Sequence, residues 1–402
     1  MNPKISQLIL VICATALVLA APFLNPLVTG VFGILFAAAM YFIANIRYFA
    51  IGAAVLALLY AIGFIHLSAF AGPLLMILWG EGLRMLLRRF GHEMVVFAAG
   101  SIAALAAVML YTGEADPLVG CIAVLVLLML RSILTDREDG SMLSLIGVSM
   151  TIVLFEDLEF LVDMKMLALA VILCAAFGYF AYRAKTIDMS GVFSAVLFGV
   201  ILITFTKGIA WFIVVMAFFI LGSVFTKFKY SEKEFLGVAQ GKSGRRGYKN
   251  AFANAGVGIV ACILFGLTGD MVYAALFLGS IATATADTLA SEVGVTGGTP
   301  YMITTMKPCP PGTNGGVTVL GEAACLFGSL VIALLGFFLG VAPWYVCVIA
   351  AAAGFIGTNL DSLYGALMEN KGLFGNAGTN LLATLSGGLA AVGIYLLAGI
   401  FI

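Results

Sequence analysis

Two carboxylates occupy a stretch of small and apolar residues, TATADTLASEVG, at positions 283–294. If this stretch is helical, each residue turns about 100°, so Asp287 and Ser291 share one face while Thr288 and Glu292 share another. An acid within an apolar helix is costly, and this makes the stretch a candidate for function. The alternative is a hydrogen-bonded polar cluster that holds helices together.

A second acid stands in GTNLDSLYGAL, residues 357–367, where Asp361 is followed by Ser362. We expect the acids of the two stretches to converge on the cytoplasmic side of the membrane. Mg²⁺ prefers one or two carboxylates together with phosphate oxygens and water. The sequence therefore predicts a magnesium site. The predicted metal ligands are Asp287, Glu292 and Asp361, of which Asp287 and Asp361 are also predicted to be catalytic, and Ser291 and Ser362 are predicted to bind substrate.

A glycine-rich segment, KPCPPGTNGGV at residues 307–317, lies between the two acidic stretches. Its glycines let the backbone approach a ligand closely, and backbone N–H groups in such a loop can bind an anion. Lys307 adds a point charge and is predicted to be catalytic. A plain turn explains the glycines about as well. The predicted anion-binding residues of the loop are Gly312, Thr313, Asn314, Gly315 and Gly316.

A basic segment, GKSGRRGYKNAFAN at residues 241–254, offers a third group of phosphate-binding candidates. Glycines separate Lys242 from Arg245 and Arg246, and an arginine guanidinium suits bidentate phosphate binding. Asn254 follows at the start of the next apolar run. Basic residues beside a membrane also serve as a topology signal or contact lipid headgroups, and these readings weigh about equally here.

The elements that must position these residues are membrane-spanning helices. Of the 402 residues, 63% are hydrophobic and only 10% are charged, which is the composition of a polytopic helical membrane protein. A net charge of zero gives no sign of a nucleic-acid partner. Seven scattered cysteines and two histidines predict neither a disulfide framework nor a zinc site. The sequence thus predicts an all-α bundle of about 13–15 spans. The candidates are 5–22, 28–45, 48–64, 67–83, 93–112, 118–134, 141–156, 164–182, 189–206, 208–226, 251–268, 271–290, 321–340, 344–366 and 379–401.

The basic residues predict the orientation. Seven of the 20 Lys and Arg residues follow the candidate span 208–226, so this loop is expected in the cytoplasm together with the N-terminus and the loop 291–320. A location in the cell membrane follows. Loops are short up to residue 183 and longer beyond it, which predicts an N-terminal multi-span region of unknown role at 1–183 and a catalytic-type membrane domain at 184–402.

Five blocks in order resemble one integral-membrane family, long known as domain of unknown function 92. They are GSVFTK (222–227), GKSGRRGYKNAFAN (241–254), ADTLASEVG (286–294), TTMKPCPPGTNGGVTVLG (304–321) and GTNLDSLYGAL (357–367). That family includes vertebrate transmembrane protein 19 and the phytyl-phosphate kinase of plant tocopherol synthesis. Two of the blocks are also distantly similar to CTP-using phytol and dolichol kinases. The resemblance implies a kinase that converts an isoprenyl monophosphate to the diphosphate with Mg²⁺ and a nucleoside triphosphate, CTP or ATP, and it adds Lys227 to the binding residues.

Two other functions stay open on the sequence. A polytopic transporter of an ion or small solute also carries intramembrane acids and glycine-broken helices, although no convincing internal repeat is present. A nucleotidyltransferase that forms a CDP-lipid needs the same metal and phosphate groups. The expected partners are a lipid phosphate and the membrane, and the sequence gives no indication of an oligomeric state.

The orientation predicts that the loops 227–250 and 291–320 are both cytoplasmic. Single cysteines placed at Ser243 and Thr313, in a chain whose own cysteines are replaced, should therefore resist a membrane-impermeant maleimide in intact cells and react after lysis. Labelling of one position but not the other in intact cells would contradict a shared site.

Overall fold

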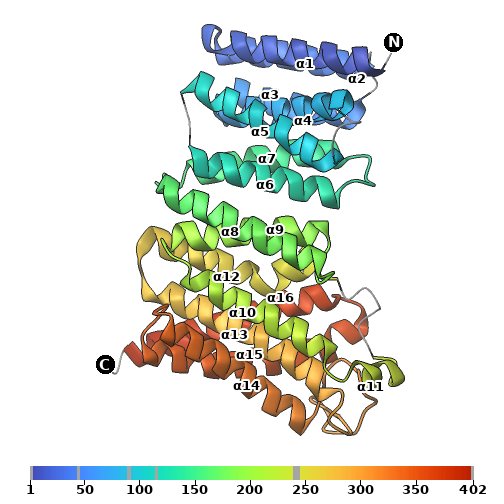
Figure 1. Cartoon of the computed structure of the whole chain (residues 1–402), viewed down its shortest axis with the longest axis vertical. Coiled ribbons are helices and arrows are strands. Elements are labelled where there is room, and N and C mark those ends of the chain that lie inside the picture. The colour runs from blue at the N-terminus through green and yellow to red at the C-terminus, as the bar shows by residue number, and fades with distance from the viewer. Residues whose placement is uncertain (1–2, 43–45, 88–91, 114–115, 239–244, 400–402) are drawn as a thin grey trace. The chain divides into compact units, whose positions relative to one another are not determined.

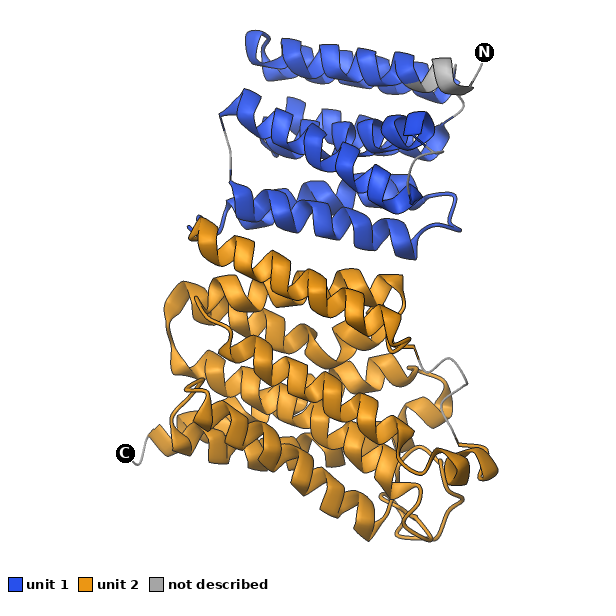
Figure 2. Cartoon of the chain, in the orientation of Figure 1, with its two compact units in different colours: residues 1–161 blue, residues 162–402 orange. Residues whose placement is uncertain are grey.

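The computed structural model describes residues 3–42, 46–87, 92–113, 116–238 and 245–399. The chain forms two compact helical units, residues 1–161 and 162–402 (Figures 1 and 2). Each predicted span corresponds to one long helix, so the all-α membrane fold is confirmed. Helices form along these runs because a helix satisfies its own backbone hydrogen bonds, as an apolar environment requires. Lys242 and Ser243 lie outside the described residues.

Unit 1 consists of helices alone among its described residues. They are α1 (Pro3–Ala20), the 3-10 turn η1 (Ala21–Phe23), α2 (Pro26–Phe42), α3 (Arg47–Ala61), α4 (Leu67–Leu87), α5 (Glu93–Thr112), α6 (Pro117–Ile133) and α7 (Gly140–Glu156). Its half-buried charges compensate each other, since Glu81 on α4 accepts hydrogen bonds from Arg84 and from Arg131.

Unit 2 holds the remaining helices and one small departure from the all-helical expectation, a pair of two-residue strands. Its elements are α8 (Met164–Arg183), α9 (Met189–Phe205), α10 (Ala210–Lys227), α11 (Tyr230–Phe235), α12 (Tyr248–Thr268), α13 (Met271–Gly294), β1 (Tyr301–Met302), β2 (Gly316–Val317), α14 (Val319–Phe338), α15 (Trp344–Leu367), the 3-10 turn η2 (Glu369–Lys371) and α16 (Asn376–Gly399). The strands are antiparallel, with Tyr301 opposite Val317 and Met302 opposite Gly316.

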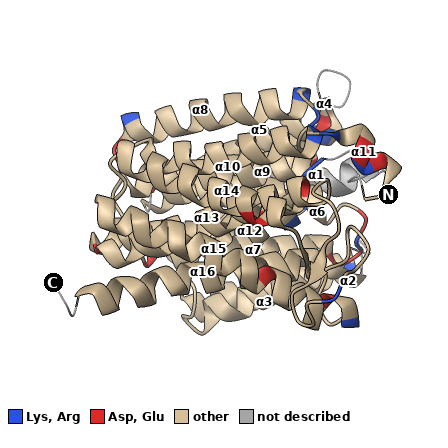
Figure 3. Cartoon of the chain, turned by 90° about the horizontal axis from the view of Figure 1, so that it is seen from below, with Lys and Arg blue, Asp and Glu red and all other residues tan. Residues whose placement is uncertain are grey.

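Length separates the helices into two classes. Nine of the described helical segments are long and apolar enough to cross a membrane, and six further apolar helices have 10–17 residues. Together they account for the fifteen predicted spans. Most charged residues gather toward the ends of the helices, and only a few acidic residues lie further along them (Figure 3). This distribution is what a bilayer requires of a helical protein.

The two units divide one helix earlier than the boundary predicted at residue 183. Helix α8 belongs to unit 2 because it packs along α9, where a Cβ on Gly178 would lie 3.1 Å from Val192 and 3.3 Å from Val196. The loops of unit 2 also meet, since Val238 lies beside Gly312. The segments after α10 and after α13 therefore lie at the same end of this unit, as their predicted shared location requires.

Helix α13 is the centre of unit 2. Within its most apolar window 72% of the residues are buried, the highest share among the nine long helices of the described chain. Glycines on its neighbours let them approach closely: a Cβ on Gly357 of α15 or on Gly387 of α16 would overlap the Oγ1 atom of Thr283. Small residues at helix interfaces permit this kind of contact.

The contact at Thr283 sets the register of the acids. Asp287 lies one turn after Thr283 on α13, and Asp361 lies one turn after Gly357 on α15. Gly354, earlier on α15, contacts Ala282, which is also earlier on α13. The two helices therefore run in the same direction. The close approach of the two helices therefore brings the two aspartates to the same level, near the ends of their helices.

Gly387→Ala should destabilise the protein, because the added methyl group overlaps Thr283 in a packed interface. The expected loss is about 1–3 kcal/mol. Gly393→Ala on the same helix is the matched control, since a Cβ there meets nothing within 4 Å and alanine favours the helix. Thermal unfolding of both variants in detergent measures the difference. Equal melting temperatures would contradict the close packing at Thr283.

Candidate active site

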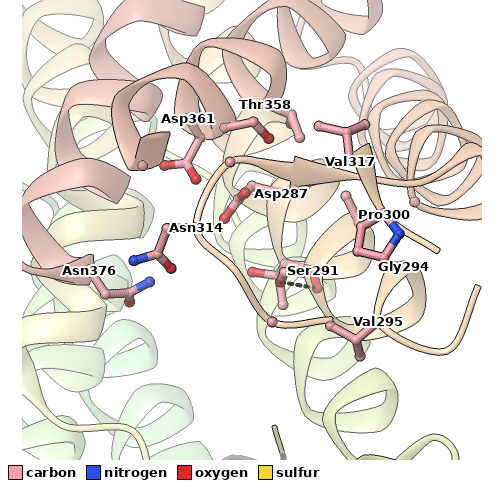
Figure 4. Close-up of a pocket in the computed structure, with 18 of the residues that line it drawn as sticks. Asp287, Ser291, Gly294, Val295, Pro300, Asn314, Val317, Thr358, Asp361 and Asn376 are labelled. Carbon is pink, nitrogen blue, oxygen red and sulfur yellow. Dashed lines mark hydrogen bonds between the residues drawn. The ribbon is translucent and has the colours of Figure 1, made fainter. Parts of the chain in front are cut away.

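A polar cavity of about 220 Å³ opens where α12, α13, α14, α15 and α16 meet the loop 300–318 (Figure 4). Eleven of the predicted site residues line it. They are Arg246, Asn254, Asp287, Ser291, Gly312, Thr313, Asn314, Gly315, Gly316, Asp361 and Ser362. The structure thus brings together residues from four separate segments of the sequence.

Asp287 and Asp361 point toward each other across the cavity (Figure 4). Their carboxyl groups are close enough to interact directly, and both are buried, with the negative charge of Glu369 also nearby. Oδ1 of Asp361 is buried and has no hydrogen-bond partner among the described residues. Two facing buried carboxylates can both stay ionised only if a cation lies between them. Without a cation, they share a proton.

The pair fits a divalent cation that takes its remaining ligands from phosphate and water. Mg²⁺ binds in this way through one or two carboxylates. No group of three or more His, Cys, Asp or Glu side chains is arranged to hold a metal within the described part of the chain. The predicted three-carboxylate site is therefore reduced to two aspartates.

Glu292 is the predicted ligand that the structure does not bring into the cavity. It lies five residues after Asp287, which turns it about 140° around the helix. There its Oε2 accepts from Nζ of Lys233 at 2.6 Å, and its Oε1 accepts from Oγ1 of Thr226 at 2.9 Å. Glu292 thus belongs to a buried ion pair with Lys233 and not to the metal ligands.

Of the basic residues predicted to bind phosphate, one lines the cavity and others lie outside it. Arg246 lines the cavity, and among the described residues it is the one Lys or Arg that does so. Arg245 and Lys227 are exposed outside the lining, while Lys242 is not described. Lys307 is exposed on the turn that follows β1, where Met306 adopts a left-handed conformation (φ 53°) and the N–H of Met302 donates to the carbonyl of Lys307. The structure corrects the prediction for Lys307, because this turn carries it out of the cavity.

The backbone around Arg246 is fixed by a bridge to Ile187. The N–H of Arg246 donates to the carbonyl of Thr186 at 2.9 Å, and its own carbonyl accepts from Asp188 at 3.3 Å. Burial lowers the pKa of the guanidinium below its ordinary value, and the charge of Glu292 opposes this shift. An arginine stays protonated in this range, so Arg246 supplies a positive charge to a cavity that also contains the two aspartates.

The glycine-rich loop is docked against α15. At Gly315, which has φ 85°, a Cβ would lie 2.5 Å from Cβ of Ala366 and 2.8 Å from the carbonyl of Ser362. The N–H of Gly316 is already used, since it donates to the carbonyl of Thr313 at 2.9 Å. Gly316 therefore shapes the loop and does not offer its N–H to a ligand, contrary to the prediction of a nest that includes it.

Four asparagines of α12 and α16 line the cavity, and only one of them, Asn254, was among the predicted site residues. Nδ2 of Asn380 donates to Oδ1 of Asn254 at 3.4 Å, and Nδ2 of Asn254 donates to the carbonyl of Asn250 at 2.9 Å. Oδ1 of Asn380 is left buried without a partner among the described residues. Asn376 and Asn380 were missed, although they stand four residues apart at the start of an apolar run, as Asn250 and Asn254 do. The other lining residues missed include Thr288, Thr318, Glu322, Thr358 and Glu369.

Comparisons with known proteins find similarity in the part of the chain that forms the cavity. The model of the integral membrane protein family DUF92 matches residues 172–388. An uncharacterized membrane protein of Methanocaldococcus jannaschii is 34% identical over 217 residues, which are 53% of this chain and 87% of that protein. An uncharacterized membrane protein of Synechocystis is 36% identical over 188 residues, 46% of this chain and 73% of that protein.

The chloroplastic protein VTE6 of Arabidopsis thaliana is 34% identical over 194 residues, 46% of this chain and 57% of that protein. No solved structure matches the chain significantly. The family match covers more than half of the chain, all within unit 2, and includes every residue that lines the cavity. The protein therefore belongs to the integral membrane family DUF92.

Proposed function

We propose that this protein transfers a phosphoryl group from a nucleoside triphosphate to an isoprenyl monophosphate at the membrane surface. The observation that carries the proposal is the facing pair Asp287 and Asp361 in the lining of a polar cavity, with Oδ1 of Asp361 buried and without a hydrogen-bond partner among the described residues. The resemblance of the sequence blocks to a family that includes the phytyl-phosphate kinase of plant tocopherol synthesis supports the choice of reaction.

Phosphoryl transfer needs charge neutralisation and in-line positioning more than covalent participation by the protein. Asp287 and Asp361 would hold Mg²⁺, which neutralises charge on phosphate oxygens when bound. Arg246, which also lines the cavity, would donate to a phosphate oxygen. Residues 311–317 form one wall of the cavity, and in the bound state this wall would limit the access of water to the donor.

The size and place of the cavity suit a lipid substrate. At about 220 Å³ it is smaller than the roughly 300–1,000 Å³ of pockets that enclose a whole small molecule. It therefore encloses the phosphate end of a ligand and leaves the remainder outside. Since the surrounding helices are long and apolar enough to span a bilayer, an isoprenyl tail remains in the lipid while its phosphate enters the site.

The position of the acids favours an enzyme over a transporter. Asp287 and Asp361 lie within about two turns of the ends of α13 and α15. Transporters that bind substrate between broken helices place their sites near the middle of the bilayer. In the described residues α13 and α15 are also continuous helices.

The reaction is tested by incubating the purified protein with Mg²⁺, CTP or ATP, and geranylgeranyl or phytyl monophosphate. An isoprenyl diphosphate identified by mass is the expected product. A CDP-lipid would instead identify a nucleotidyltransferase, and the absence of both products would return the transporter to first place.

Asp287→Asn and Asp361→Asn should each lower kcat by at least about 100-fold, because the amide keeps the shape of the carboxyl group but cannot carry its charge. Asp136→Asn, an exposed acid in unit 1, is the matched control and should be unchanged. The activity is measured across a Mg²⁺ titration beside the melting temperature. Full activity with unchanged Mg²⁺ dependence in either variant would remove that aspartate from the metal site.

Arg246→Gln should weaken phosphate binding by roughly 10- to 150-fold, the cost of about 1.5–3 kcal/mol for a charge-assisted hydrogen bond. Its neighbour gives the control: Arg245→Gln removes the same charge from an exposed position. Lys307→Met should likewise stay within about 0.5 kcal/mol of the parent, as expected for exposed sites. The dissociation constant for inorganic pyrophosphate with Mg²⁺ distinguishes the three variants. A larger effect at Lys307 than at Arg246 would contradict the site.

A further inference from the structure

The ion pair of Lys233 and Glu292 lies outside the cavity lining and takes no part in the transfer described above. Its Nζ and Oε2 atoms are 2.6 Å apart, and the two side chains are only 2% and 6% exposed. Burying two charges is costly unless their remaining hydrogen bonds are satisfied. The pair therefore calls for a reason beyond holding two helices together.

Lys233 is held by more than the carboxylate. Its Nζ also donates to the carbonyls of Phe225 at 2.9 Å and Thr226 at 3.3 Å, at the end of α10. A cation is favourable at the C-terminal end of a helix, where carbonyl groups lack partners. Lys233 thereby holds the short helix α11 against the C-terminal end of α10, and its bond to Glu292 fixes that carboxylate as well.

Glu292 reaches the cavity through a single hydroxyl group. Its Oε1 accepts from Oγ1 of Thr226 at 2.9 Å, and Oγ1 of Thr226 in turn accepts from Nη2 of Arg246 at 3.4 Å. The Thr226 hydroxyl also lies 2.8 Å from the carbonyl of Gly222, so its one proton is shared between that carbonyl and the carboxylate. Its lone pairs remain free to accept from an N–H of Arg246. The three side chains thus form a chain that leads from Glu292 to Arg246.

The guanidinium of Arg246 lies against α10 at Gly222, one turn before Thr226. A Cβ there would be 2.7 Å from Nη1 and 2.9 Å from Nη2, so a larger residue would displace the group. Arg246 is therefore confined between a glycine and a threonine of the same helix face.

We infer that Glu292, neutralised by Lys233, is a positioning residue that holds Arg246 in its phosphate-binding orientation through Thr226. The inference rests on the proposed function, in which Arg246 binds phosphate. A carboxylate in direct contact with Arg246 would occupy the N–H groups that a phosphate needs. With one hydroxyl between them, the carboxylate compensates the buried guanidinium, and most of its five N–H donors remain for the ligand. Lys233 keeps Glu292 from turning to Arg246 directly.

The test is a double-mutant cycle on the full-length protein in detergent. Glu292→Gln and Thr226→Val are each made in the parent and in the Arg246→Gln background. The dissociation constant for inorganic pyrophosphate with Mg²⁺ and the KM for geranylgeranyl monophosphate are measured beside the melting temperature. Thr226→Ser, which keeps the hydroxyl, serves as the rescue variant. Thr204→Val is the control, because that buried hydroxyl bonds only to carbonyls of its own helix among the described residues.

Both substitutions should raise the pyrophosphate dissociation constant roughly 10-fold in the parent, an effect typical of residues that orient a ligand-binding group. They should have no further effect once Arg246 is glutamine, and Thr226→Ser should bind like the parent. An equal loss in both backgrounds, or no loss in the parent, would overturn the positioning role. Should Glu292→Gln fail to fold, Thr226→Val alone decides, since it leaves the ion pair intact.

The same data separate this inference from the reaction itself. If the parent forms no isoprenyl diphosphate but the cycle shows coupling to Arg246, the proposed reaction fails and the positioning role stands. Two other outcomes would overturn both proposals: Arg246→Gln binds pyrophosphate as tightly as the parent does, or the parent does not bind it. In either case Arg246 does not bind phosphate, and Glu292 does not position it for that purpose.

Discussion

The close approach of α13, α15 and α16 around Thr283 determines the rest of unit 2. Gly357 and Gly387 leave no side chain between the helices, so the backbones meet where Thr283 lies. One turn beyond this contact the same helices have to present Asp287 and Asp361 to each other. The position of the carboxylate pair is thus a consequence of backbone packing, and any change that separates these helices changes the distance between the acids as well.

The buried charges discussed for unit 2 have compensating partners, with the exception of the pair Asp287 and Asp361. Glu292 has Lys233 and Thr226, and Arg246 has Thr226 and the nearby charge of Glu292. Asp287 and Asp361 have each other, which is a repulsive arrangement unless a cation or a proton intervenes. A fold that satisfies its other buried charges so fully, yet retains two facing acids, points to a ligand as the missing partner. That contrast within one helix bundle is the strongest structural argument for a metal–phosphate site.

The sequence was a good guide to the helices and an uneven guide to the site. Continuous apolar runs correspond to the nine long and the six shorter apolar helices of the described chain, because in such runs composition alone decides the structure. Helical spacing also separated the face of Asp287 from that of Glu292, but it could not say what each face meets. The partner of Glu292 is Lys233, 59 residues away. Lys307 was misplaced because a left-handed Met306 redirects the turn, and Asn380 was missed because its role depends on contact with Asn254, which is distant in sequence.

The last long helix supplies Asn376 and Asn380, while the cavity draws its other residues from segments as early as Arg246. During synthesis the chain therefore cannot complete this site until α16 has entered the membrane and packed against α12. A protein interrupted before α16 would carry the aspartates and the arginine without the wall that closes around them. Under the proposed function, insertion of α16 is thus a condition for activity, and a chain without it would hold the aspartates and the arginine in an open, incomplete site.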